Sequence, residues 1–149
     1  MANKESRIIA VDYGLARLGL AVSDPTKLIA FPLHVLKAEK KSEFTAKRLL
    51  EYIERYCQEK NCAVEFILIG MPYMMSGKKG LLADEVDHFC SLLKTLTEIP
   101  VHTWDERLTT VMAERSLRET SLTRKRRAQV VDAVSAGLLL QNYLDSKRV

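Results

Sequence analysis

The sequence predicts an α/β domain in which a mixed sheet is covered by helices on both faces. Short runs of branched apolar residues fill the first part of the chain, and after residue 42 such runs alternate with longer segments whose apolar residues recur at helical spacing. The chain has 149 residues, is 47% hydrophobic, and contains no linker, repeat or low-complexity stretch. We therefore expect residues 1–149 to form one domain around a single core.

Three strands are expected first. The strand expected over 7–12 contains the apolar run 8–11, typical of a strand that is buried on both faces. Gly14 permits a tight turn, after which 18–22 should form an antiparallel partner strand. A third strand is expected over 29–36, where Pro32 indicates a bulge or an edge position. The sheet should therefore begin as an antiparallel meander.

Helices and strands alternate in the rest of the chain. The expected elements are a helix over 42–60 with Ser42 as a candidate N-cap, a strand over 64–69, a glycine- and lysine-rich loop over 73–80, a helix over 82–96, a strand over 101–104, a short helix from Thr109 or Thr110, and a final helix over about 128–144. This order of elements is that of the ribonuclease-H-like fold. The predicted architecture is a mixed five-stranded sheet, an antiparallel meander of three strands plus two parallel strands, flanked by helices.

Acidic residues stand at the edges of several of these buried segments. Asp12 ends the first strand, Asp105 and Glu106 end the strand over 101–104, and Asp132 interrupts an otherwise apolar helix. A carboxylate in such a position needs a cation or a hydrogen-bond donor. Because the acids come from separate segments, they predict a shared site for Mg²⁺ or Mn²⁺ and hence phosphodiester chemistry.

Asp105 and Glu106 are adjacent, so in an extended chain they point to opposite faces and only one should reach the metal. Burial alone does not decide which. Glu106 has the longer reach, whereas Asp105 has the size to cap a turn or a helix. We expect Asp12, Glu106 and Asp132 to be the metal ligands and keep Asp105 as a further candidate for catalysis.

Each acid also has a structural explanation. Asp12 could cap the turn at Gly14, and Asp105 or Glu106 could cap the helix that follows. Asp132 could bond a buried arginine such as Arg17. Taken together, acids at two strand ends and on a helix favour a catalytic site over three separate structural roles.

Basic residues are the candidates for contacts with nucleic acid. The formal net charge is +4 and the sequence pI is about 9.0, which favours polyanionic partners. Arg17 follows the Asp12 turn, where it could grip a phosphate or neutralise the acids. Further candidates for phosphate contacts are Lys78, Lys79, Arg124, Lys125, Arg126 and Arg127.

Cysteine usage and hydropathy bear on location. Cys57, Cys62 and Cys90 lack metal-site spacing and are expected to be reduced thiols. Residues 1–6 are too polar for a signal peptide, and no apolar stretch is long enough to span a bilayer. We therefore expect a cytoplasmic protein without a membrane partner.

Several segments, in this order, resemble one known family. They are 12–24 (DYGLARLGLAVSD), 69–72 (IGMP) with glycines at 77 and 80, 105–110 (DERLTT), 132–133 (DA) and 140–145 (LQNYLD). This pattern resembles the YqgF family, also called RuvX, of ribonuclease-H-like proteins related to the RuvC resolvases. The resemblance implies a nuclease that matures the 5′ end of 16S ribosomal RNA from its precursor, with active-site acids at Asp12, at Asp105 or Glu106, and at Asp132. The chain departs from the family pattern at Met74 and Ser76.

Rival functions use part of the same pattern. A resolvase of branched, four-way DNA junctions would use the same acids and predicts a dimer, whereas a catalytically silent RNA-binding factor would need only the basic face. A nucleotide-phosphate binder of the actin-like type needs two lobes, and 149 residues supply one. For the nuclease we expect a monomer or a weak homodimer.

Overall fold

The computed structural model describes residues 4–72, 80–105 and 124–147, and over 124–133 it gives the course of the backbone only. The elements are β1 (Glu5–Tyr13), β2 (Arg17–Ser23), β3 (Ala30–Lys37), α1 (Ser42–Lys60), β4 (Cys62–Met71), α2 (Leu81–Leu96), β5 (Val101–Asp105) and α4 (Arg124–Ser146). The predicted order of elements is confirmed over these ranges. Most of the loop expected over 73–80, and all of the helix expected from Thr109 or Thr110, lie outside the described residues.

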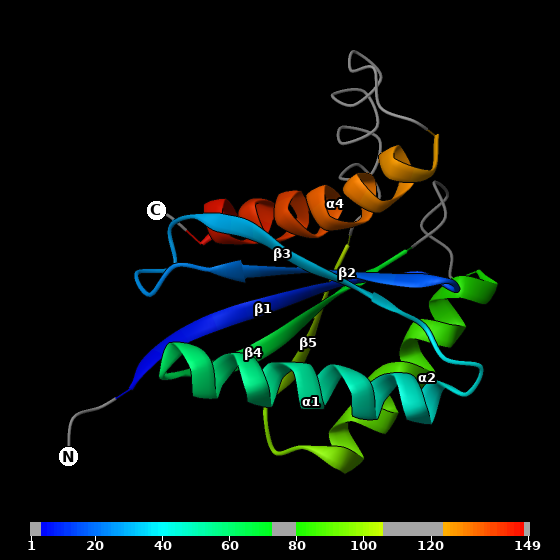
Figure 1. The fold of residues 1–149 in the computed structure, drawn as a ribbon, viewed down its shortest axis with the longest axis horizontal. Coiled ribbons are helices and arrows are strands. Elements are labelled where there is room, and N and C mark those ends of the chain that lie inside the picture. The colour runs from blue at the N-terminus through cyan, green and yellow to red at the C-terminus, as the bar shows by residue number, and fades with distance from the viewer. Residues whose placement is uncertain (1–3, 73–79, 106–123, 148–149) are drawn as a thin grey trace.

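The strands form one five-stranded sheet in the order β3-β2-β1-β4-β5 (Figure 1). β1 pairs with β2, and β2 with β3, in antiparallel fashion. β1 pairs with β4, and β4 with β5, in parallel fashion. The predicted mixed sheet is confirmed, and β1 lies at its centre, where the antiparallel half meets the parallel half.

Strand β3 forms one edge of this sheet and carries an irregularity beside Pro32. Leu20 of β2 pairs with His34, but the next residue, Ala21, pairs with Pro32, so Leu33 is an extra residue on β3. A proline lacks the amide hydrogen that a central strand needs, which confines it to such positions. Both features predicted for Pro32, an edge strand and a bulge, are confirmed.

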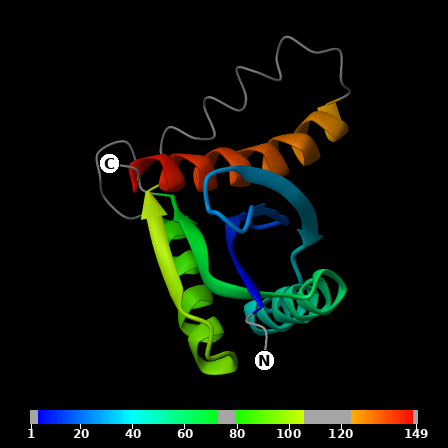
Figure 2. The ribbon, with the colours of Figure 1, turned by 90° about the vertical axis from the view of Figure 1, so that its left-hand side faces the viewer.

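The sheet has two covered faces, because successive side chains of a strand point in opposite directions. Ile9 and Val11 of β1 belong to the larger core with residues of α1 and α2. Ile8 and Ala10 belong to a smaller core with residues of α4. Figure 2 shows α4 lying across one face while α1 and α2 lie against the other. We call these the α4 face and the α1–α2 face.

Helix α1 has the predicted bounds but not the predicted N-cap. Ser42 is its first residue, and the cap is Lys41, with φ −102°, ψ 130° and no side-chain cap hydrogen bond. The Lys41 carbonyl accepts hydrogen bonds from the amides of Phe44 and Thr45, at 3.0 and 3.2 Å. The buried Thr45 hydroxyl accepts from the Glu39 amide at 2.9 Å, which holds the chain ahead of the helix and places the cap one residue earlier.

Helix α4 begins at Arg124 rather than near residue 128, so the basic run 124–127 forms its first turn. Two contacts hold its C-terminal half on the sheet. The Tyr143 ring lies edge-on to Trp104 of β5 with centroids 5.2 Å apart, and the Gln141 side-chain oxygen accepts from the Ala30 amide at 2.9 Å. Among the described residues, no helix is long and apolar enough to cross a membrane.

All three cysteines are free thiols, as predicted. Burial raises the pKa of Cys90 to about 11. Burial also raises the pKa of Cys57 to about 11, and the neighbouring Cys62 thiol adds to this effect. At neutral pH, Cys57 and Cys90 are therefore protonated.

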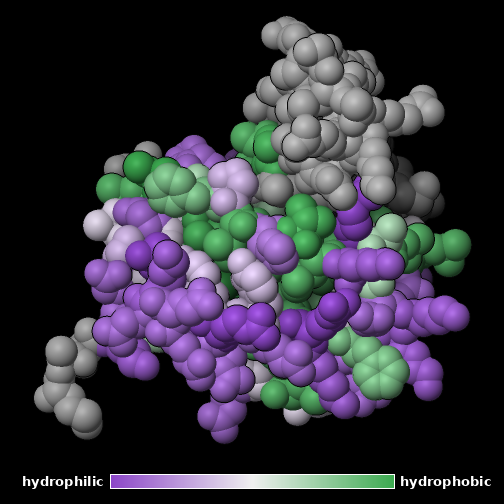
Figure 3. All heavy atoms as spheres, viewed as in Figure 1, coloured by the Kyte–Doolittle hydropathy of each residue, from purple (hydrophilic) through white to green (hydrophobic). Residues whose placement is uncertain are grey.

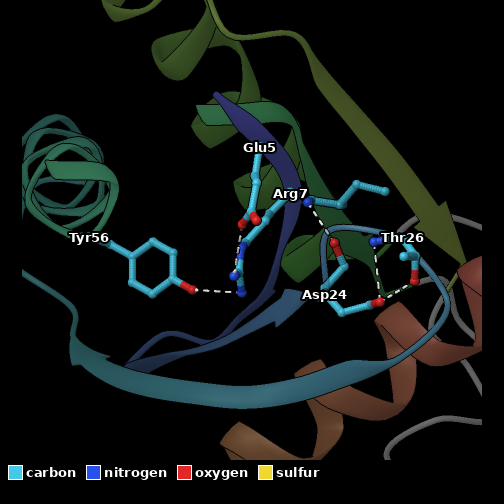
Figure 4. Close-up of polar contacts among 7 residues, drawn as sticks. Glu5, Arg7, Asp24, Thr26 and Tyr56 are labelled. Carbon is cyan, nitrogen blue, oxygen red and sulfur yellow. Dashed lines mark hydrogen bonds and ion pairs between the residues drawn. The ribbon is translucent and has the colours of Figure 1, made fainter. Parts of the chain in front are cut away.

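Polar contacts fix the end of the sheet at which β1 begins (Figure 4). The Arg7 guanidinium reaches across to α1, where it donates to the Tyr56 hydroxyl at 3.5 Å, and it pairs with the Glu5 carboxylate, also at 3.5 Å. The Ile8 amide donates to the buried Ser23 hydroxyl at 2.9 Å. These contacts join β1 to α1 and β2 at the end opposite Asp12.

The turn between β2 and β3 is organised by one carboxylate, that of Asp24. It accepts hydrogen bonds from the amides of Thr26, Leu28 and Ile29 at 3.2, 2.8 and 2.9 Å, and from the Thr26 hydroxyl. The Ile29 amide, followed by the Thr26 hydroxyl, holds the pKa of Asp24 well below its usual value of 3.8. The ionised carboxylate is thus a structural part of this turn.

Asp24→Ala should lower the free energy of unfolding by about 1–2 kcal/mol, because several donors lose their charged acceptor. Since the folded pKa lies below the unfolded one, the contribution of Asp24 is complete above about pH 4 and is lost as the pH falls further. The stability gap between the parent and Asp24→Ala should therefore narrow on acidification. Urea unfolding at a series of pH values measures it, with Glu98→Ala as a surface control. A gap that does not change with pH would contradict this role.

Candidate active site

Asp12 lies next to the last residue of β1, and its half-buried side chain is on the α4 face. It shares this face with Ile8 and Ala10, which belong to the core beneath α4. Its partner across the β1–β2 ladder is Gly19. Because Gly19 has no side chain, no residue of β2 stands directly beside the Asp12 carboxylate on this face.

The hairpin after Asp12 is tight and requires a glycine. The Gly14 amide donates to the Arg17 carbonyl at 2.9 Å. A Cβ atom built on Gly14 would lie 2.7 Å from that same oxygen, which is closer than real Cβ atoms approach. The tight turn predicted at Gly14 is confirmed, and it fixes the return of the chain from Asp12 into β2.

Arg17 opens β2 and lies on the same face as Asp12. It alternates in phase with Gly19 and Ala21, and Ala21 packs in the core beneath α4. Gly19 is opposite Asp12, and Arg17 precedes Gly19 by two residues. Arg17 is therefore the neighbouring residue of β2 on the face of the Asp12 carboxylate. The structure therefore brings Asp12 and Arg17 to one end of one face.

A second cation joins this end of the sheet. Lys37, the last residue of β3, is the direct ladder partner of Arg17 and therefore lies on the α4 face as well. Lys37 was not among the predicted site residues, because its place depends on the β2–β3 register and on the bulge at Leu33. Counting alternate residues along β2 and β3 pairs Lys37 with Arg17 only when the position of the bulge is already known.

Asp105 occupies the other face. It ends β5 opposite Met71 of β4, and Met71 belongs to the core beneath α1 and α2. It also alternates in phase with Val101, which packs against that core. Asp12 and Asp105 thus lie at the same end of the sheet but on opposite faces.

Asp132 lies in α4, four residues before Ala136, which packs on the sheet. Figure 1 shows the N-terminal half of α4, drawn in orange, at the end of the sheet that holds the β1–β2 hairpin. The backbone therefore carries position 132 toward the Asp12 end of the sheet. The side chains of Asp132, Arg124, Lys125, Arg126 and Arg127 are outside the described part of the structure.

The other predicted site residues, Glu106, Lys78 and Lys79, lie outside the described residues altogether. Of the three expected metal ligands, only Asp12 has a described side chain. Among the side chains that the structure describes, no three histidine, cysteine, aspartate or glutamate residues are grouped so that they could hold a metal ion.

The comparison with known proteins identifies the family. A family model described as RuvX, Holliday junction resolvase, matches residues 6–146. A protein of Protochlamydia amoebophila (strain UWE25), named "Putative pre-16S rRNA nuclease", is 58% identical over 144 residues, covering 97% of this chain and 96% of its own. A protein of the same name from Roseiflexus sp. (strain RS-1) is 37% identical over 148 residues, covering 99% of this chain and all of its own.

The chain belongs to the RuvX family. The names of these RuvX relatives describe nucleases, which are hydrolases that act on ester bonds, in agreement with the predicted enzyme class.

Solved structures confirm the predicted fold of this RuvX chain. The structure of T. thermophilus RuvC in complex with a Holliday junction substrate matches with a TM-score of 0.55 at 15% identity, covering 95% of this chain and 96% of that one. The fowlpox virus Holliday junction resolvase also gives a TM-score of 0.55, at 16% identity, covering 94% and 99%. At such low identity these likenesses show the fold alone, which is the ribonuclease-H-like fold expected from the order of elements.

Gly14→Ala should destabilise the RuvX fold and displace Asp12 from Arg17, because the new methyl group meets a backbone oxygen that cannot rotate away. We expect a loss of about 1–3 kcal/mol of unfolding free energy. Gly137→Ala in α4 is the matched control, since its Cβ would lie an ordinary 3.5 Å from the Pro32 ring and alanine favours the helix. Thermal melts of both variants test this, and equal melting temperatures would contradict it.

Proposed function

We propose that this RuvX protein is a divalent-metal-dependent nuclease that acts on RNA in maturation of the 5′ end of precursor 16S rRNA. The observation that carries the proposal is the placement of Asp12, a carboxylate on the α4 face at the end of the central strand, with Arg17 on the same face. The name "pre-16S rRNA nuclease" carried by relatives supports RNA as the substrate.

The metal ligands in this proposal are Asp12, Glu106 and Asp132. Asp105 lies on the face opposite Asp12, and in an extended chain the residue after it takes the other phase, which favours Glu106. Position 132 precedes Ala136 by about one helical turn, and Ala136 packs on the sheet beneath α4. Gly19, opposite Asp12 in the β1–β2 ladder, has no side chain that would compete with a cation for the Asp12 carboxylate.

These three carboxylates would form an all-oxygen donor set, which suits Mg²⁺ or Mn²⁺ better than zinc or copper. Cations held there would activate the attacking water and stabilise the leaving oxygen. The backbone of Asp12 is held by its pairing with Gly19 of β2, and the preceding Val11 pairs with Ile69 of β4, so the carboxylate would enter the reaction already positioned.

Cationic side chains of this RuvX chain would hold the phosphodiester. Arg17 can donate two parallel hydrogen bonds to the non-bridging phosphate oxygens and offset the charge that develops on them. The first turn of α4, with Arg124, Lys125, Arg126 and Arg127, and the loop residues Lys78 and Lys79 would contact neighbouring phosphates. Such contacts position the strand without reading its sequence.

A second candidate is a resolvase of four-way DNA junctions, favoured by the description of the family model. It would use the same carboxylates in a dimer, whereas we propose a monomer or weak homodimer in the cytoplasm. Incubation with Mg²⁺ or Mn²⁺, with precursor 16S RNA and a synthetic junction in parallel, separates the two. Cleavage of the junction alone would replace the RNA proposal with the resolvase.

Asp12→Asn should reduce cleavage by about 100-fold or more, because the metal loses a ligand that is fixed on the central strand. Its melting temperature should stay equal or rise, since one of several clustered carboxylates becomes neutral. Single-turnover cleavage and a thermal melt on the same preparation measure both effects. A well-folded Asp12→Asn protein that still cuts at the parental rate would remove Asp12 from the mechanism.

Glu106→Gln should also lose cleavage while keeping its melting temperature. Asp105→Asn should keep most cleavage and lower the melting temperature instead, because Asp105 is on the face away from Asp12. The two substitutions each convert one acid to its amide, so each serves as the control for the other. The reverse pattern would assign the catalytic role to Asp105.

A further inference from the structure

Phe44, in the first turn of α1, is an aromatic residue left half-exposed among cations. Its side chain is 50% exposed. The ammonium groups of Lys41 and Lys47 lie 6.0 and 5.8 Å from the ring centroid. A lone exposed apolar residue needs no explanation, but an exposed ring flanked by lysines has the composition of surfaces that bind single-stranded nucleic acid.

Within the segment around this ring, residues 37–48, the charge that remains after ion pairing is cationic. Within residues 37–48, five side chains are cationic and two are carboxylates. Both carboxylates are paired, Glu39 with Arg48 at 2.5 Å and Glu43 with Lys47 at 3.3 Å. In the described part of the chain, no ion pair holds the remaining cations, which are Lys37, Lys40 and Lys41.

Lys37 connects this charge to the candidate active site. It is directly opposite Arg17 in the β2–β3 ladder, so the two cationic side chains lie next to each other on one face. One phosphate could accept hydrogen bonds from both cations. Lys37 is exposed and lies on the α4 face, the face of Asp12.

The segment from Lys37 to Phe44 leads away from that site along the edge of the molecule. The Ala38 amide donates to the Ala16 carbonyl at 2.9 Å, which holds the end of β3 against the β1–β2 hairpin. Figure 1 shows α1 beginning at this same end of the sheet. Figure 3 shows hydrophilic side chains gathered over the start of α1 and the turn before it. Lys37 and Phe44 are thus two points on one hydrophilic edge of the molecule (Figure 3).

We propose that this edge, here called the β3–α1 surface (Lys37, Lys40, Lys41, Phe44 and Lys47), binds the single-stranded segment that flanks the scissile phosphate. Lys37 and Arg17 share the phosphate next to the site, and Phe44 stacks on an unpaired base farther along. A surface depression of about 440 Å³, lined by Glu39, Phe44, Lys47, Arg48 and Glu51, lies beside the ring and gives the base room. The inference rests on the proposed nuclease function.

Binding is best measured in the full-length chain carrying Asp12→Asn in metal-free buffer, by fluorescence anisotropy of a labelled, unstructured RNA of about 12 nucleotides. Phe44→Leu keeps an apolar side chain but removes the π face, so it should weaken binding about tenfold. Phe44→Trp should retain the affinity. The fluorescence of the Phe44→Trp protein should fall when RNA is added. The fall should exceed any change in the parent, whose one tryptophan is Trp104. Leu96→Ala, at the far end of α2, is the matched control.

Lys37→Ser should act through charge instead of stacking. It should reduce the magnitude of the log–log salt slope of RNA binding by about 0.7, the contribution of one single-strand phosphate contact. Lys60→Ser, at the other end of α1, should leave the slope unchanged. Phe44→Leu should weaken binding while leaving the slope at the parental value.

Two results would overturn the proposal that the β3–α1 surface binds single-stranded RNA. One is parental affinity of Phe44→Leu for single-stranded RNA. The other is an equal loss of affinity for a duplex of the same sequence, whose stacked bases are not available to Phe44. Because binding is measured without cleavage, these results leave the nuclease proposal standing. Conversely, a parent protein that binds through Phe44 but cuts no substrate would end the nuclease proposal alone.

Discussion

The double pairing of β1 is the constraint on which the remaining structure depends. This strand is antiparallel to β2 over Ile9–Tyr13 and parallel to β4 over Glu5–Val11, so each of its residues is paired on at least one side and its middle on both. Its alternate side chains enter two separate cores. If this strand shifted by one residue, the side chains that fill each core would move to the opposite face of the sheet, so its register is fixed. Asp12 belongs to this fixed register, which holds its carboxylate on the α4 face.

Much of the fold was predictable from the sequence, because apolar periodicity reports burial directly. The structure has the predicted elements where apolar residues recur with the expected spacing, namely the strands around 7–12 and 64–69 and the helix over 42–60. Pro32 was read correctly as an edge and bulge residue, since its missing amide hydrogen excludes it from a central ladder. The N-cap of α1 was misplaced, because the Thr45 hydroxyl, which binds the backbone ahead of the helix, gives no signal in a linear pattern.

The candidate site was predictable only in part. The acids could be named, because a carboxylate at the end of an apolar run is conspicuous, but their faces could not be assigned. The face of Asp105 depends on its pairing with Met71, which no local sequence pattern encodes. The same limit hid Lys37, whose partner on β2 is fixed by a bulge, and the solvent exposure of Phe44, which a linear pattern does not encode. Register and solvent exposure are properties of the assembled sheet.

The protonated state of the cysteines has a practical consequence for the chemistry of this protein. The thiolate is the species that reacts with maleimides and oxidants. With a pKa of about 11, Cys57 and Cys90 each present roughly one thiolate per ten thousand molecules at pH 7, and Cys62 is buried. A cysteine placed on the exposed edge beside α1 would therefore react far ahead of Cys57 and Cys90. Cross-links and spin labels can be attached there without first removing the native cysteines, so the path of a bound strand can be mapped on the unaltered fold.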